Sequence, residues 1–236
     1  MTNRRPENWR ELQDLVAYYF NYSGYEAEVS KTIKTVRGQV EIDVFVKARE
    51  ELGESIMCEC KFWNTPIPQE KIHAFRTVVN DSGASLGIII SKIGFQSGAY
   101  LAAENSNIKL LIWKEFLDLL YDKWFDFRKK RLLRIIQPLA VYTDPFDVPT
   151  EMFSPNQTKE YKDSLNKYLP IRIIGSSMNN NFINDYEKTF NEEIQSYEDY
   201  FDKMEKKGLE AVSYYEEFFS GFDIPEWKFN FNIERF

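Results

Sequence analysis

Cysteine and histidine are scarce in this sequence: its 236 residues include two cysteines and one histidine. Cys58 and Cys60 stand two residues apart in an expected strand, where neighbours on one face are poorly placed to form a disulfide. No disulfide framework is expected, and a reducing cytoplasm fits. A zinc site is also excluded, because there is no second cysteine pair and His73 is the only histidine. A single histidine also excludes His-Asn-His catalysis, and Ser-His-Asp catalysis is not expected because we interpret His73 as a surface or packing residue.

Long apolar runs are also lacking. No stretch approaches the roughly 20 apolar residues that a membrane helix needs. The polar segment from Met1 to Arg10 lacks the apolar core of a signal peptide. We therefore expect a soluble, cytoplasmic protein without a membrane partner, and the 43% hydrophobic content is enough for a packed core.

Basic charge is not in excess, since the formal net charge is -7. The imbalance is local: residues up to Pro149 carry 20 basic and 20 acidic side chains, whereas those from Thr150 onward carry 10 and 17. A neutral N-terminal region leaves room for a local basic groove that binds nucleic acid.

Hydrophobic periodicity predicts an α/β sandwich with a central mixed sheet in the first half of the chain. Its helices and strands are expected in the order α, three β, α, β, α, β. The expected helices are residues 8–22, 69–80 and 99–104, and the expected strands are residues 25–35, 40–46, 55–62, 86–90 and 108–113.

Beyond this core a helical pattern resumes at Lys114, and near its end lies a basic cluster of Arg128, Lys129, Lys130, Arg131 and Arg134. Residues 182–219 are expected to form one or two acidic, aromatic-rich helices that pack a core, bind a protein, or act as a lid that mimics nucleic-acid charge. We expect three regions: the core (1–120), a helical connector with the basic cluster (121–149), and a mainly helical C-terminal region (150–236).

The main chemical signal is Asp43, followed after fifteen residues by Glu59-Cys60-Lys61. Strand alternation places Glu59 and Lys61 on one face, so two neighbouring strands can bring both carboxylates and the lysine together. Two carboxylates can hold Mg²⁺, which polarises a phosphate and lowers the pKa of a bound water. The lysine can orient that water and offset charge on the phosphate. The alternative is a solvated strand face with an incidental ion pair.

Several other side chains are candidates for the metal or for DNA. Glu41 shares the face of Asp43, as a further metal-site carboxylate or a solvated strand end. The loop from Ser91 to Gly98 opens a helix, where backbone amides attract phosphate, although a tight turn with a cap is the alternative. The basic cluster can clamp phosphates or form a solvated helix face. The predicted DNA-binding residues are Gln69, Ser91, Gln96, Ser97, Arg128, Lys129, Lys130 and Arg131.

The stretch from Trp9 to Phe116 resembles the Mrr-like branch of the PD-(D/E)xK restriction endonucleases. Five segments match in the expected order, and they are LQDLVAYYFNYSGYEAE, RGQVEIDVFV, MCECKFW, GASLGIIIS and GFQSGAYLAAE. The resemblance implies a restriction-endonuclease-like α/β/α core with a Mg²⁺-dependent site, at which Mn²⁺ substitutes. It makes Lys61 the catalytic lysine and Asp43 and Glu59 metal ligands, and we include Cys60 among the metal-binding residues.

One position departs from the family pattern. The first helix of the family often carries a glutamate that reaches the metal, and the corresponding residue here is Gln13. An amide ligates Mg²⁺ more weakly than a carboxylate does, although it can position water or phosphate. Glu11 is the competing candidate, and the alternative for Gln13 is a polar flank of a packed helix.

Three hypotheses follow. The first is a metal-dependent endonuclease that cuts DNA in defence against foreign DNA, acting as a homodimer because cutting both strands usually takes two active sites. The second is a nuclease fold that cuts poorly and recruits DNA, or a partner protein through its C-terminal region; Gln13 favours it. The third is an effector role led by the C-terminal region.

Overall fold

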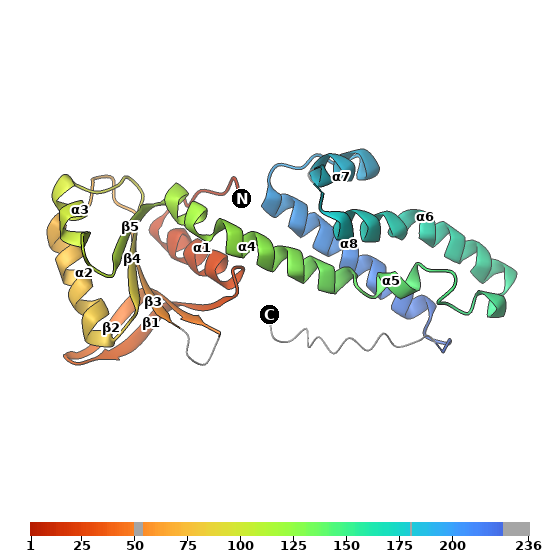
Figure 1. Cartoon of the computed structure of the whole chain (residues 1–236), viewed down its shortest axis with the longest axis horizontal. Coiled ribbons are helices and arrows are strands. Elements are labelled where there is room, and N and C mark those ends of the chain that lie inside the picture. Colours follow the sequence, from red (N-terminus) through yellow and green to blue (C-terminus); the bar gives the residue numbers. More distant parts are fainter. Residues whose placement is uncertain (50–53, 180, 224–236) are drawn as a thin grey trace. The chain divides into compact units, whose positions relative to one another are not determined.

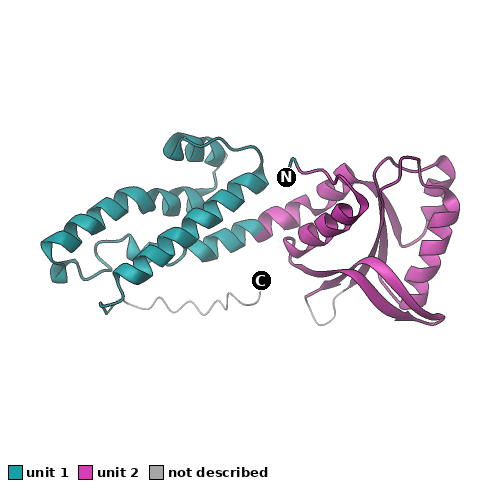
Figure 2. Cartoon of the chain, turned by 180° about the vertical axis from the view of Figure 1, so that it is seen from behind, with its two compact units in different colours: residues 1–3, 128–236 teal, residues 4–127 magenta. Residues whose placement is uncertain are grey.

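The computed structural model describes residues 1–49, 54–179 and 181–223 (Figure 1). The chain forms two compact units, one of residues 4–127 and one of residues 1–3 with 128–236 (Figure 2). The division falls inside helix α4 (Trp113–Ile136), whereas the sequence suggested boundaries after residues 120 and 149. The division between the two units lies within one continuous helix, where no change in residue composition marks it.

The unit of residues 4–127 contains a five-stranded sheet in the order β1-β2-β3-β4-β5. β1, β2 and β3 pair antiparallel, whereas β3, β4 and β5 pair parallel. Helices α2 and α3 lie on one side of the sheet and α1 lies on the other (Figure 1). The predicted α/β core with a mixed sheet is therefore confirmed. Its elements are α1 (Trp9–Asn21), β1 (Tyr25–Thr35), β2 (Gly38–Ala48), β3 (Ser55–Lys61), α2 (Gln69–Ser82), β4 (Leu86–Ser91), α3 (Ser97–Ala103) and β5 (Ile108–Ile112).

Helix α1 begins and ends at residues suited to helix ends. The Asn8 side chain accepts a hydrogen bond from the Glu11 backbone N–H, which satisfies a donor left open by the first turn. The apolar stripe that includes Leu12 and Val16 is buried, and this burial holds the helix on the sheet. The helix ends at Asn21, and the turn that follows leads into β1 through Gly24, whose φ of +85° favours glycine.

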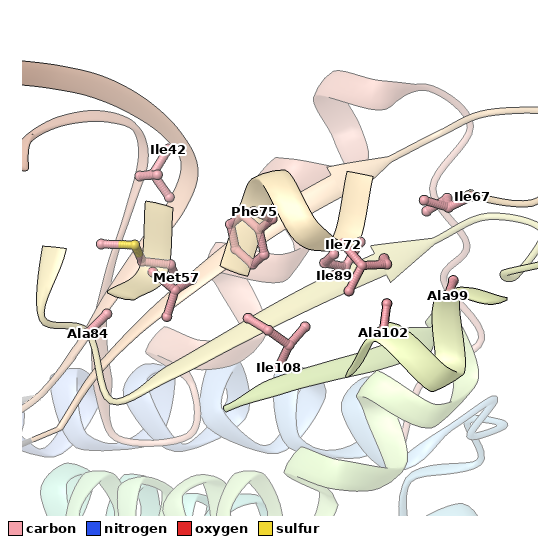
Figure 3. Packing of buried hydrophobic residues seen from close by; sticks show 11 residues of the cluster. Ile42, Met57, Ile67, Ile72, Phe75, Ala84, Ile89, Ala99, Ala102 and Ile108 are labelled. Atoms are coloured by element: carbon pink, nitrogen blue, oxygen red, sulfur yellow. The ribbon is translucent and has the colours of Figure 1, made fainter. Parts of the chain in front are cut away.

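The core between α2 and the sheet is tightly packed. Phe75 of α2 lies over the sheet beside Ile89 and Ile108 (Figure 3). The closest approach is at Gly87 of β4, where an added Cβ would lie 2.6 Å from Ile108 Cδ1 and 2.8 Å from Val79 Cγ2. A glycine at this position lets α2 pack directly on the strand that borders β3.

The second unit is helical, as the sequence predicted. The prediction missed the start of α6, where Ser154 and Gln157 form a capping box and Pro155 takes the first helical position. Pro170 is of a residue type that usually ends a helix, but it lies inside this one. The elements after α4 are α5 (Leu139–Tyr142), the 3₁₀ turn η1 (Thr150–Met152), α6 (Pro155–Ser177), α7 (Phe182–Phe190) and α8 (Tyr197–Phe218).

A buried ion pair joins α4 to α8 within this unit. Arg128 is fully buried, and its Nε donates to Glu205 Oε1 at 3.0 Å, while Nη2 donates to Asp202 Oδ1 at 2.7 Å. Gly208 lets the helices approach, since an added Cβ would lie 2.9 Å from Ile136 Cγ2. Across the residues that the structure describes, no helix combines the length and the apolar character needed to cross a membrane.

Candidate active site

The candidate site lies where strands β2 and β3 stop pairing. Their ladder runs from Lys47 opposite Ser55 to Val44 opposite Cys58. Beyond this pair, a side chain of β2 replaces the backbone as the partner of β3: Asp43 Oδ2 accepts a 2.7 Å hydrogen bond from the Cys60 backbone N–H. The carboxylate therefore bonds a strand amide, which fixes its position.

The pairing of β2 with its other neighbour, β1, is also interrupted at Asp43. The β1–β2 pairing passes from Val29 opposite Val44 to Lys31 opposite Ile42. Ser30, between the two paired residues of β1, has a φ of +54°, which is uncommon for a residue with a side chain. The local geometry of the sheet therefore changes at the residue that carries the first predicted carboxylate.

Gln13 faces Asp43 from helix α1. Its side chain is fully buried, and its Nε2 donates a 2.8 Å hydrogen bond to Asp43 Oδ1. Its Oε1 is buried, and no hydrogen bond from the described residues reaches it. The competing candidate, Glu11, instead accepts a hydrogen bond from the Glu7 backbone N–H at the start of the helix. The structure thus brings Gln13, and not Glu11, to Asp43.

Glu59 and Lys61 form an ion pair beside Asp43. Their side chains are 26% and 19% exposed, so both remain accessible from solvent. Burial raises the pKa of Glu59 above its usual value and the charge of Asp43 adds to this, whereas the hydrogen bond and charge of Lys61 and the charge of Lys71 lower it. Asp43 and Glu59 thus repel each other electrostatically, and the two lysines partly offset the charge of Glu59.

The donor set fits a hard divalent cation. Mg²⁺ prefers oxygen ligands and usually keeps several waters, so two carboxylates are sufficient protein ligands. The unbonded Gln13 Oε1 adds a buried acceptor beside Asp43, which suits a cation or one of its waters. Among the described residues, no group of three or more histidine, cysteine, aspartate or glutamate side chains could hold a metal. Asp43 and Glu59 are the carboxylates that could hold such an ion, together with water and, from α1, the Gln13 amide.

Two further metal candidates lie in different environments. The Cys60 side chain is buried, and the residue reaches Asp43 through its backbone N–H. Burial raises the pKa of the Cys60 thiol well above its usual value, which disfavours the thiolate that would bind a metal. Glu41 is exposed on β2, opposite Thr32 of β1. A thiolate ligand at Cys60 is therefore disfavoured, and Glu41 lies on the solvent-exposed part of its strand.

The predicted DNA-binding loop after β4 divides into two parts. Ser91 is buried, and its hydroxyl donates to the Gly94 carbonyl and accepts from the Gly94 N–H, so it holds the turn. This corrects the expectation that Ser91 contacts phosphate. Gln96 and Ser97 are exposed at the start of α3. Gln69, exposed at the start of α2, lies against this loop, since a Cβ on Gly98 would meet its Oε1 at 2.8 Å.

The basic cluster is not one continuous surface. Arg128 is fully buried and bonded to Asp202 and Glu205, which argues against the predicted phosphate contact. The Arg131 Nε also bonds Glu205, at 3.0 Å. Only Lys130 is exposed, and Lys129 is partly buried. The charge pattern of this helix could not reveal these contacts, because the acidic partners of Arg128 and Arg131 lie more than 70 residues further along the chain. His73 is exposed, as predicted.

Sequence reasoning missed three side chains next to the site, and these are Trp9, Trp63 and Lys71. Trp9 of α1 donates its indole N–H to the Cys60 carbonyl at 3.2 Å. Trp63 follows β3 and is 38% exposed, with the Lys61 ammonium 5.7 Å and the Lys71 ammonium 5.9 Å from its ring centroid. The only signal in the sequence was a tryptophan two residues after the expected catalytic lysine.

Comparison with known proteins gives a family match. The Mrr catalytic-domain family, described as restriction endonuclease, matches residues 5–120. The crystal structure of a protein of unknown function, AF1548, is similar to the chain with a TM-score of 0.41 and 18% identity, and covers 89% of this chain and 100% of that one. No curated protein matches the sequence. Residues 5–120 therefore belong to the Mrr family of restriction endonuclease catalytic domains.

Proposed function

We propose that this protein is a Mg²⁺-dependent endonuclease that hydrolyses DNA phosphodiester bonds, with Mn²⁺ as a substitute, in restriction or another defence against foreign DNA. The observation that carries the proposal is the fixed Asp43 carboxylate beside the Glu59–Lys61 ion pair, at the point where two strands separate. The match of residues 5–120 to a restriction endonuclease family supports the nuclease chemistry.

Each side chain has a distinct part in this proposal. The bound cation would supply a polarised phosphate and a water of lowered pKa. Asp43 is held at both oxygens by Gln13 and Cys60, so it presents its remaining lone pairs without reorganising. Glu59 would help to hold the cation, and the Lys61 ammonium, which is paired with Glu59 here, would donate to a phosphate oxygen or orient the attacking water. The leaving group is the 3′ oxygen.

The proposal is tested by cleavage of supercoiled plasmid with Mg²⁺ and with EDTA. We expect cutting by the wild type only with metal, and a loss of roughly 100-fold or more in Asp43→Asn and Lys61→Met, as is typical when an electrostatic catalytic group is removed. Asp14→Asn is the matched control, because Asp14 is an exposed carboxylate on the same helix as Gln13. Cutting by Asp43→Asn at the wild-type rate would refute the assignment.

One observation favours a second function, a DNA-binding or recruitment module that cuts poorly. The neutral Gln13 stands where the family often has a glutamate, so the site offers two carboxylates where three would bind metal more tightly. In this case the plasmid stays supercoiled with every variant while gel shifts persist. The C-terminal region would then bind the partner protein, which a pull-down with the full chain detects.

We further propose a homodimer, because cutting both strands at one place needs two active sites. Sedimentation velocity of the full chain gives the oligomeric state, and the ratio of linear to nicked plasmid reports paired cutting. A monomer that only nicks would contradict this arrangement.

A further inference from the structure

A second lysine lies beside the candidate site and is not one of the predicted catalytic residues. Lys71 is exposed in the first turn of α2, and its ammonium lies 5.9 Å from the centroid of Trp63. Lys61 approaches the same ring to 5.7 Å. One half-exposed indole thus contacts two ammonium groups, which is the cation–π arrangement that holds lysines on an aromatic face.

The backbone fixes the relation between these two lysines. Residues 62–68, which join β3 to α2, are fastened to the loop after β4 through Ile67. Its N–H donates to the Gly94 carbonyl at 3.0 Å, and its carbonyl accepts from the Gln96 N–H at 3.0 Å. Ile67 itself is fully buried. The start of α2, and Lys71 with it, is therefore anchored to the loop after β4, and the Lys92 N–H of that loop donates to the Lys61 carbonyl at 3.0 Å.

The charges at the site leave a role for Lys71. Asp43, Glu59 and Lys61 together carry one negative charge, so a divalent cation makes the set singly positive. That charge balances a single phosphodiester, the one that is cut. The added positive charge of Lys71 balances a second one, and an exposed ammonium binds phosphate as a point charge.

We propose that Lys71, held against Trp63, forms a phosphate subsite that binds a phosphodiester next to the one that is cut. This inference rests on the proposed function, because it concerns the same DNA strand. The competing explanation is that Lys71 only packs on Trp63, and in that case DNA binding does not depend on its charge.

The test measures binding and cleavage separately. Fluorescence anisotropy with a labelled DNA duplex in EDTA gives the affinity at several salt concentrations. Removing one phosphate contact in Lys71→Gln should lower the affinity about 5- to 10-fold near 0.1 M salt and reduce the salt slope by about one. Lys71→Arg should retain most of the affinity. Lys34→Gln, at an exposed lysine of β1, is the matched charge control and should change neither quantity.

Cleavage kinetics separate the two lysines. Lys71→Gln should raise KM and leave kcat within about threefold, whereas Lys61→Gln should lower kcat, because uniform binding acts on KM and transition-state contacts act on kcat. Trp63→Leu should weaken DNA binding as Lys71→Gln does, whereas Trp63→Phe, which keeps an aromatic ring, should retain most of the wild-type affinity. Wild-type affinity in Trp63→Leu would show that the ring does not hold Lys71.

The outcomes also distinguish this inference from the proposed function. If Lys71→Gln and Lys34→Gln bind DNA equally well while the wild type cuts, the subsite is refuted and the nuclease stands. If no protein cuts but only Lys71→Gln loses affinity and salt slope, the nuclease is refuted and the phosphate-binding role of Lys71 stands.

Discussion

The Nε2 of Gln13 lies 2.8 Å from Oδ1 of Asp43, so a neutral amide on α1 stabilises the carboxylate of β2. In Gln13→Glu this attraction becomes a repulsion between two acids. Without metal we expect a lower melting temperature than in the wild type. With Mg²⁺ or Mn²⁺ we expect a larger rise in melting temperature, because a third carboxylate strengthens metal binding and ligand binding stabilises the folded state.

Thermal unfolding with and without metal measures this difference. The control is Glu11→Gln, which alters a carboxylate of the same helix that bonds the Glu7 backbone and not Asp43. An identical metal-induced shift in the wild type and in Gln13→Glu would mean that Gln13 lies outside the reach of the ion.

A second prediction concerns the packing of α2 on the sheet. Gly87→Ala places a methyl group 2.6 Å from Ile108 and 2.8 Å from Val79, so side chains or backbone must shift. Overpacking of this kind costs about 1–3 kcal/mol. Urea denaturation of the full chain measures it, with Ser85→Ala at an exposed neighbour expected to change stability by less than about 0.5 kcal/mol. Equal stability of the two variants would contradict the close approach.

The buried ion pair of the helical unit leads to a third prediction. In Glu205→Ala the fully buried guanidinium of Arg128 loses the carboxylate at 3.0 Å and keeps only Asp202, which should destabilise the unit by up to about 3–5 kcal/mol. Changing both Arg128 and Glu205 to methionine should recover much of this loss, because the buried guanidinium is removed together with its carboxylate. Asp118→Ala breaks an exposed pair with Lys114 and should cost less than about 1 kcal/mol in the same unfolding measurement.

Fourth, the two cysteines should be chemically inert in the folded protein. Burial raises the pKa of Cys58 and of Cys60, so both thiols stay protonated near neutral pH. The thiolate is the reactive form, and neither side chain is exposed. We expect no reaction with a thiol reagent such as dithionitrobenzoate in buffer, and two equivalents on addition of denaturant. Rapid labelling of the native protein would show that β3 opens readily.

Fifth, the helical unit should lose stability in alkali. Burial raises the pKa of Tyr214 to about 12, aided by its hydrogen bond to Glu160. An unfolded tyrosine titrates near 10, so this contribution is complete below about pH 10 and is lost as the pH rises to about 12. Absorbance at 295 nm and helical circular dichroism follow it, and Glu160→Gln should lower the pKa of Tyr214. A Tyr214 that titrates near 10 in the folded protein would be inconsistent with this contact.

The sequence predicted the α/β core well because its elements are encoded locally. The strand expected at 25–35 is β1 to the residue, and α2 begins at the expected Gln69. Alternation also indicated that Glu59 and Lys61 share a face, and the two form an ion pair. The long helix α6 was missed because an internal proline and many polar residues hide its apolar stripe.

Contacts between distant segments could not be predicted in the same way. The partners of Arg128 lie on α8, so a basic run on α4 looked like an exposed surface when part of it is core. The pairing of Lys71 with Trp63 depends on how the loop after β3 folds back, which no local pattern encodes. Ser91 looked available for phosphate because the turn that binds its hydroxyl forms only around Gly94.

The fastening of the loop after β3 to the loop after β4 has a consequence for engineering. Ile67 bonds Gly94 and Gln96, and the Lys61 carbonyl accepts from the Lys92 N–H at 3.0 Å. The loop of residues 62–68 and the loop of residues 92–96 are therefore held together by backbone hydrogen bonds, although 20 or more residues separate them in the chain. We expect a chimera that takes only residues 62–68 from a relative to displace Lys61 and Lys71. Exchanging residues 62–68 and 92–96 together should keep both lysines in place.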